Sequence, residues 1–234
     1  MVIAPHPDDE IIGCGAFLLL ASRVGVFNRS KRFIACATSG ATGVSDEYLY
    51  TINESRKLPE EEKISCKNVV REDETRLCCA SVGAEPLFFR LPFYHEGNFG
   101  AKNIEVISEI LDDVKPDIIF TIDETGDPHG THGMVRDFVS QTLKKLKFDG
   151  IVLGYRVWSK GYVLGDGDVL IGFDEEIMRE KRRLLSIYKS QVLFPAYPHE
   201  KKSFVELMED CNRELAENFC SSYRYAEAFK HLIL

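Results

Sequence analysis

The chain opens with MVIAPHPDDE (residues 1–10), and these ten residues decide how the rest of the sequence is interpreted. Residues 2–4 are apolar and predict a short buried strand. An imidazole at His6 and three carboxylates at residues 8–10 follow directly, and two intervening prolines stiffen the backbone that carries them. In open sheets of parallel strands, ligands bind beyond the carboxyl ends of the strands. The stretch therefore predicts both the first strand and a functional loop.

Beyond this stretch, short apolar runs alternate with longer helical patterns. Five further runs are typical of strands: 32–38, 86–91, 117–122, 151–158 and 169–173. Six segments show helical patterning: 10–24, 71–82, 103–114, 131–146, 175–191 and 204–219. Strands that alternate with helices of ten or more residues predict βαβ units. We therefore predict an α/β, Rossmann-like fold, in which a mostly parallel β-sheet carries helices on both faces.

The length of the chain suits one folded domain. Its 234 residues contain no internal repeat, so we predict a single domain over residues 1–234. Hydrophobic residues make up 44% and charged residues 28%, which excludes a disordered or fibrous chain. The segment 53–74 is the most polar, and we expect its first half to be a surface insertion and its second half to begin a helix.

Charge and cysteine content exclude several classes of function. The net charge of −8 argues against binding to a nucleic-acid backbone, which needs a basic surface. Seven scattered cysteines, an odd number, indicate a reduced chain rather than a disulfide framework. The longest apolar run, 11–21, is shorter than the ~18 residues of a membrane span. We expect a soluble, cytoplasmic protein, and the sequence does not predict its oligomeric state.

The cluster of acids after the first strand predicts a metal site. Three adjacent carboxylates repel one another at a half-buried strand end unless a cation lies between them. His6 and Asp9 are ligand types that suit zinc, and a catalytic zinc site needs a third protein ligand. The best candidates follow the run 117–122, where His129 and His132 stand three residues apart at the start of a predicted helix.

Two other interpretations of this region are open. The acids could simply cap the following helix, with Asp8 or Asp9 at its N-cap and Glu10 in its first turn. The glycines at 13 and 15 begin a dinucleotide-type pattern, but Leu18 stands where that pattern needs a third glycine. Capping requires neither the histidine nor the double aspartate, so the metal site is the stronger hypothesis.

At this point the chain resembles the PIG-L/LmbE-like N-acetylglucosaminyl de-N-acetylases. The PHPDDE motif of that family stands complete at residues 5–10, and His-Gly-Thr-His at 129–132 corresponds to its HPDH motif. The helix pattern over residues 71–83, Tyr-Lys-Ser-Gln at 188–191 and Tyr-Ala-Glu-Ala-Phe at 225–229 are also similar. The resemblance thus covers most of the chain.

The resemblance implies a zinc-dependent hydrolase that removes an N-acetyl group from an N-acetylglucosamine-type sugar or its conjugate. His6, Asp9 and His132 would bind the zinc ion. Iron(II) or cobalt(II) would accept the same ligands. Asp8 would be the general base that takes a proton from the attacking water.

Two further roles follow from the resemblance, and one residue departs from it. His129 would polarise the amide carbonyl and stabilise the oxyanion, and Arg71 would contact the substrate. Thr131 replaces the aspartate of HPDH, and Asp123 or Asp127 could substitute for it. Because of this replacement, a non-catalytic sugar-binding protein stays an alternative. A metal-dependent hydrolase of another amide, an ester or a phosphoester is also an alternative, because it would use the same ligand set.

Overall fold

The computed structural model describes residues 1–23, 29–52, 58–92, 100–123, 130–157, 163–165, 167–193, 202–220 and 222–233. Its strands are β1 (Val2–Ala4), β2 (Phe33–Cys36), β3 (Glu85–Phe88), β4 (Ile118–Ile122), β5 (Ile151–Tyr155), β6 (Val169–Phe173) and β7 (Tyr225–His231). Its helices are α1 (Asp9–Ala21), the 3-10 turn η2 (Ala41–Gly43), α2 (Asp46–Ile52), α3 (Glu60–Val82), α4 (Ala101–Val114), α5 (Gly130–Leu146), α6 (Glu175–Leu185), α7 (Lys189–Val192) and α8 (Phe204–Phe219).

The strands form one seven-stranded sheet in the order β3-β2-β1-β4-β5-β7-β6. The first five strands in this order pair in parallel, whereas β7 runs antiparallel to both β5 and β6. The order of the chain through the sheet reverses between β1 and β4, the point at which sheets of this kind bind ligands. The predicted α/β, Rossmann-like fold with a mostly parallel sheet is confirmed.

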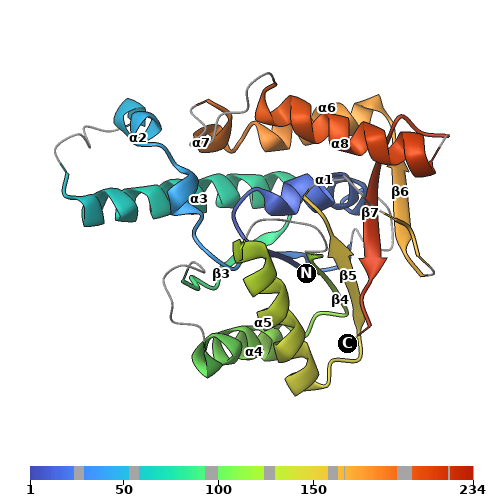
Figure 1. Ribbon diagram of the computed structural model, residues 1–234, viewed down its shortest axis with the longest axis horizontal. Coiled ribbons are helices and arrows are strands. Elements are labelled where there is room, and N and C mark those ends of the chain that lie inside the picture. The colour runs from blue at the N-terminus through green and yellow to red at the C-terminus, as the bar shows by residue number, and fades with distance from the viewer. Residues whose placement is uncertain are drawn as a thin grey trace.

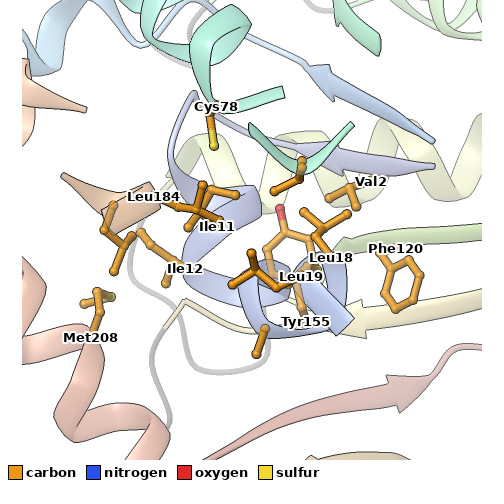
Figure 2. Packing of buried hydrophobic residues seen from close by; sticks show 14 of the residues in the cluster. Val2, Ile11, Ile12, Leu18, Leu19, Cys78, Phe120, Tyr155, Leu184 and Met208 are labelled. Carbon is orange, nitrogen blue, oxygen red and sulfur yellow. The ribbon is translucent and has the colours of Figure 1, made fainter. Parts of the chain in front are cut away.

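Helices cover both faces of the sheet (Figure 1). One hydrophobic cluster joins the sheet to α1, α3, α6 and α8, and a second joins it to α4 and α5. Figure 2 shows the first cluster, in which Ile11 and Leu18 of α1 lie among side chains from other elements. Within the described part of the chain, none of the helices has the length and apolar character needed to cross a membrane.

The glycines at 13 and 15 make room for neighbouring side chains. A Cβ atom at Gly13 would overlap the ring of Tyr155, whose hydroxyl donates to the backbone oxygen of Ile3. A Cβ at Gly15 would lie 3.2 Å from Cε of Lys181. Gly13 and Gly15, which resemble the start of a dinucleotide-binding pattern, therefore allow α1 to pack closely against β5 and α6.

A buried polar cluster links the C-terminal strand to α1. The Nζ atom of Lys181 donates to Glu227 at 2.7 Å, to Asn212 at 2.9 Å and to the backbone oxygen of Ile12 at 2.8 Å. The Glu227 carboxylate also accepts from two backbone amides of α1, at residues 16 and 17. Every donor of the ammonium group has an acceptor, as a buried charge requires.

Three sequence predictions of secondary structure need correction, and two elements were not predicted at all. The polar run at 60–63 is the exposed first turn of α3, where acidic residues favour the helix N-terminus, and not part of an insertion. Helix α2 and strand β7 were not predicted. The helix expected over 175–191 breaks after Leu185, and the break turns the following residues towards α1 and α3. The strand expected over 151–158 ends at Tyr155, and residue 158 lies outside the described residues.

Candidate metal centre and active site

The candidate site lies where β1 and β4 end side by side. His6 and Asp9 follow β1, with Asp9 as the first residue of α1. His132 lies in the first turn of α5, which follows β4. Because β1 and β4 are neighbours in the sheet, residues 123 positions or more apart in sequence meet at one edge.

Three ligand-type side chains converge there. Nδ1 of His6 lies 3.1 Å from Oδ2 of Asp9, and Nε2 of His132 lies 3.3 Å from the same oxygen. The two imidazole rings have their centroids 5.2 Å apart. One nitrogen or oxygen from each of the three residues lies within 4.8 Å of the others.

This arrangement fits a tetrahedral metal ion. Metal–ligand bonds of about 2.0–2.2 Å separate neighbouring ligand atoms by roughly 3.3–3.6 Å, close to the two distances from Asp9. Two imidazoles and one carboxylate are a ligand set that zinc and iron(II) both accept. Burial lowers the pKa of His6, which favours the neutral ring. Burial alone would raise the pKa of Asp9, but His132 and His6 hold it well below its usual range.

Asp8 is held next to this cluster in a strained backbone conformation. Its φ angle of 106° is one that side-chain-bearing residues rarely adopt, at a cost of about 1–3 kcal/mol. Its backbone N–H donates to Glu10 at 3.0 Å, and its carboxylate accepts from Nη2 of Arg71 at 3.0 Å. Burial raises the pKa of Asp8 to about 7, although Arg71 opposes the shift. The surrounding contacts thus fix the carboxyl group that is adjacent in sequence to Asp9.

Arg71 binds protein groups with both ends of its guanidinium. Nη2 donates to Asp8 and to the backbone oxygen of Pro7, and Nη1 donates to Ser190 at 3.2 Å and to Glu74 at 3.4 Å. The residue is only 2% exposed, and its Nε atom has no partner within the described residues. The structure therefore places Arg71 beneath Asp8, and contact with a substrate stays a prediction.

Gly40 lets the loop after β2 approach this network. Its φ angle of +66° is left-handed, which glycine adopts without strain. A Cβ atom there would lie 3.1 Å from Cδ of Pro7 and 3.2 Å from Nε of Arg71. The loop after β2 therefore packs directly against the strand exit that carries Asp8.

The structure describes only part of the second motif. His129 and Asp127 lie outside the described residues, so the predicted oxyanion role of His129 stays a prediction. Thr131 is fully buried, and its hydroxyl has no partner in the described part of the chain. Asp123 is bound by Arg156, with 3.1 Å between Oδ2 and Nε.

Sequence analysis missed the residues that support the site from a distance. The hydroxyl of Tyr188 donates to Glu10, and Ser190 donates to Glu74 through both its backbone N–H and its hydroxyl, at 2.7 Å each. The side chain of Gln191 donates to the backbone oxygen of Gly43. The resemblance had marked the segment 188–191, but only the fold shows that it supports the helices and loop around Asp8.

Two known proteins are similar to this chain in sequence, and a solved structure is similar to it in fold. The whole chain is 26% identical to a glucosamine-6-phosphate deaminase-like protein of Bacteroides thetaiotaomicron, but it spans only 42% of that protein's length. It is 26% identical to "Probable N-acetyl-alpha-D-glucosaminyl L-malate deacetylase 2" of Bacillus subtilis, with 82% of each chain covered. The fold resembles that of N,N'-diacetylchitobiose deacetylase from Pyrococcus horikoshii, with a TM-score of 0.70, 18% identity, and 99% of this chain and 82% of that chain covered.

The family assignment depends on the N-terminal part of the chain. Residues 1–143, which include β1, the PHPDDE motif, α3 and most of α5, match the model of the family described as "PIG-L: GlcNAc-PI de-N-acetylase". This match covers more than half of the 234 residues and contains all three ligand-type side chains of the candidate centre. The chain therefore belongs to the PIG-L family of de-N-acetylases.

Proposed function

We propose that this protein is a metal-dependent hydrolase that removes the N-acetyl group from an N-acetylglucosamine-type amino sugar or its conjugate. The observation that carries the proposal is the convergence of His6, Asp9 and His132, with Asp8 beside them, at the switch point of the sheet. Family membership and the named activities of the Bacillus and Pyrococcus relatives support the same reaction class.

His6, Asp9 and His132 would hold the metal ion, with zinc as the first choice. When bound, an ion of this kind supplies Lewis acidity and lowers the pKa of water towards 7. We assign to Asp8, which precedes the ligand Asp9 in the chain, the role of accepting the proton of the attacking water. Its carboxylate is already oriented by Arg71 at 3.0 Å, so little reorganisation is needed when the proton arrives.

The overall reaction transfers one oxygen from water to the acetyl group. The water oxygen bonds to the amide carbonyl carbon, the carbon–nitrogen bond breaks, and the nitrogen leaves with a proton as a free amine. Asp8 would return the proton that it accepted. The resemblance gives His129 the role of stabilising charge on the carbonyl oxygen, and that role belongs to the proposal. The products are acetate and the amino sugar.

The proposal is tested by acetate release from N-acetylglucosamine and its conjugates. We expect metal-loaded protein to release acetate and Asp8→Asn protein, with the same metal content, to lose at least about 100-fold in kcat, in line with the loss of general-base catalysis. Asp73→Asn is the matched control, because Asp73 is an exposed acid on α3. Wild-type protein that binds one metal ion but releases no acetate from a panel of N-acyl sugars would contradict the proposal.

A further inference from the structure

A hollow lies at the same end of the sheet as the candidate centre. Its volume is about 860 Å³, within the range of about 300–1,000 Å³ that is typical of small-molecule sites. It is bounded by the loop after β2, the N-terminal half of α3 and residues 90–92 after β3. We call this hollow the α3 cavity. His6, Asp9 and His132 are not among the residues that line it.

The α3 cavity opens at the same edge of the sheet as the metal ligands. The exits of β1, β2 and β3 are tied together, because Thr38 N–H donates to Pro5 O and Leu91 N–H donates to Ala37 O. Neighbouring strands lie about 4.8 Å apart, so the exit of β3 lies roughly 10 Å from that of β1. A substrate longer than one sugar ring could therefore reach both places.

A short wall separates the α3 cavity from Asp8. Ser39 and Ala41 line the cavity, and Gly40 between them packs against Pro7 and Arg71. On α3, Glu72 lines the cavity while the preceding Arg71 turns inwards to Asp8. In both the loop after β2 and helix α3, a residue that lines the cavity is adjacent in sequence to one that contacts the network around Asp8.

The charges that line the α3 cavity are already paired. Glu72 accepts from Nε and Nη2 of Arg90 at 2.9 and 3.1 Å, and Lys67 lies 2.6 Å from Asp46. Glu60 lies 3.4 Å from Lys63. A charged ligand would have to compete with these partners, so the charges favour a neutral one.

The other lining groups combine hydrogen-bonding and apolar surface. Ser39, Ser65 and Asn68 offer hydroxyl and amide groups, while Ile64 and Val69 are 46% and 55% exposed. A sugar ring carries hydroxyl groups at its rim and C–H groups on its faces, which matches such a mixture. A long acyl chain would need a continuous apolar wall.

We propose that the α3 cavity is the subsite for the group attached to the amino sugar, and that this group is uncharged and rich in hydroxyls, such as a second sugar ring. The inference rests on the proposed function, and it defines the substrate as a conjugate rather than a free monosaccharide. The amino sugar would occupy the space in front of Asp8, and the second ring would extend over the wall formed by the loop after β2.

The test is a substitution of Ser65, an exposed residue that lines the cavity, by a larger side chain. Ser65→Trp places a large ring in the hollow, and Leu77→Trp is the control because Leu77 is 62% exposed on the same helix and does not line the cavity. Calorimetry would measure the affinity of zinc-loaded protein for glucosamine, its β-1,4-linked dimer and glucosamine 6-phosphate. Acetate release would be measured with the N-acetylated monosaccharide and dimer.

We expect wild-type and Leu77→Trp proteins to bind the dimer at least about tenfold more tightly than the monosaccharide, and Ser65→Trp to bring this ratio close to one. The kcat/KM ratio of the two acetylated sugars should fall in parallel. An unchanged ratio in Ser65→Trp, no binding of either sugar, or preference for the phosphate over the dimer would overturn the inference. If the affinity ratio falls but no protein releases acetate, the subsite stands and the proposed hydrolysis is wrong.

Discussion

Nη2 of Arg71 donates to Oδ2 of Asp8 across 3.0 Å, and both side chains are buried. The same guanidinium also contacts Glu74 and Ser190, so one cation joins α3, α7 and the loop after β1. Asp8 has a φ angle of 106°, and these contacts are what hold it there. The position of the proposed base therefore depends on a residue 63 positions away in the sequence.

Arg71→Lys should lower activity without removing the metal. Lysine keeps the positive charge but cannot bind Asp8, Pro7, Glu74 and Ser190 at once, because it lacks the planar fork. A misplaced base predicts a fall of about 10- to 100-fold in kcat. Acetate release and metal analysis would be compared with Arg76→Lys, in which a half-exposed arginine of the same helix is replaced. Equal kcat values in the two variants would show that Arg71 does not position Asp8.

His132→Ala should abolish the stabilisation that the metal provides. Binding to the folded state alone raises the free energy of unfolding by about 2.7 kcal/mol at a ligand concentration of 100 times Kd. Thermal unfolding with and without added zinc would show a rise in Tm for the wild type and little rise for His132→Ala. His231→Ala is the control, because His231 is exposed on β7. A full rise in Tm for His132→Ala would exclude this histidine as a ligand.

Gly13→Ala should destabilise the fold although alanine is the better helix former. The added Cβ would overlap the ring of Tyr155, and forcing an extra carbon into a packed core costs about 1–3 kcal/mol. The gain in helix propensity of roughly 1 kcal/mol offsets only part of this cost. Urea unfolding of Gly13→Ala would be compared with Gly100→Ala, where a Cβ meets no described atom within 4 Å. Equal midpoints in the two variants would contradict the close packing of α1 on β5.

Lys181→Met should be more damaging than the loss of the whole ion pair. The single substitution leaves the Glu227 carboxylate buried without its cation, which costs about 3–5 kcal/mol. Lys181→Met combined with Glu227→Gln removes both charges, and the second change should recover part of the stability. Denaturant midpoints of the single and double variants would be measured beside Lys189→Met, an exposed lysine. A double variant that is less stable than Lys181→Met would refute this account of the cluster.

The sequence predicts the centre of this fold better than its periphery. The apolar residues 2–4 and the motif after them mark β1 and the site loop, because a fully buried parallel strand is a continuous apolar run. The strand β7 gave no such signal, since its buried residues include Glu227, whose charge is compensated by Lys181 from α6 and by two backbone amides of α1. Pairing of that kind depends on tertiary contacts.

In the candidate site, too, some residues could be predicted from the sequence and others could not. His6, Asp9 and His132 could be grouped from residue type and family motif, and the fold brings them together. The role of Tyr188 and Ser190 could not be predicted, because it depends on where the break between α6 and α7 directs these side chains. Residue types reveal the groups that perform chemistry, whereas the groups that orient them become visible only in three dimensions.

Asp9 and His132 begin helices that pack on opposite faces of the sheet, and this arrangement has a mechanical consequence. Asp9 begins α1, which packs on one face, and His132 belongs to α5, which packs on the other. An ion bound by both side chains would link the first turns of α1 and α5 directly, and so would join the two helical layers at the edge of the sheet. Backbone amides in the first turns of both helices should then exchange with deuterium more slowly when zinc is present, and chelation should release the two helices together.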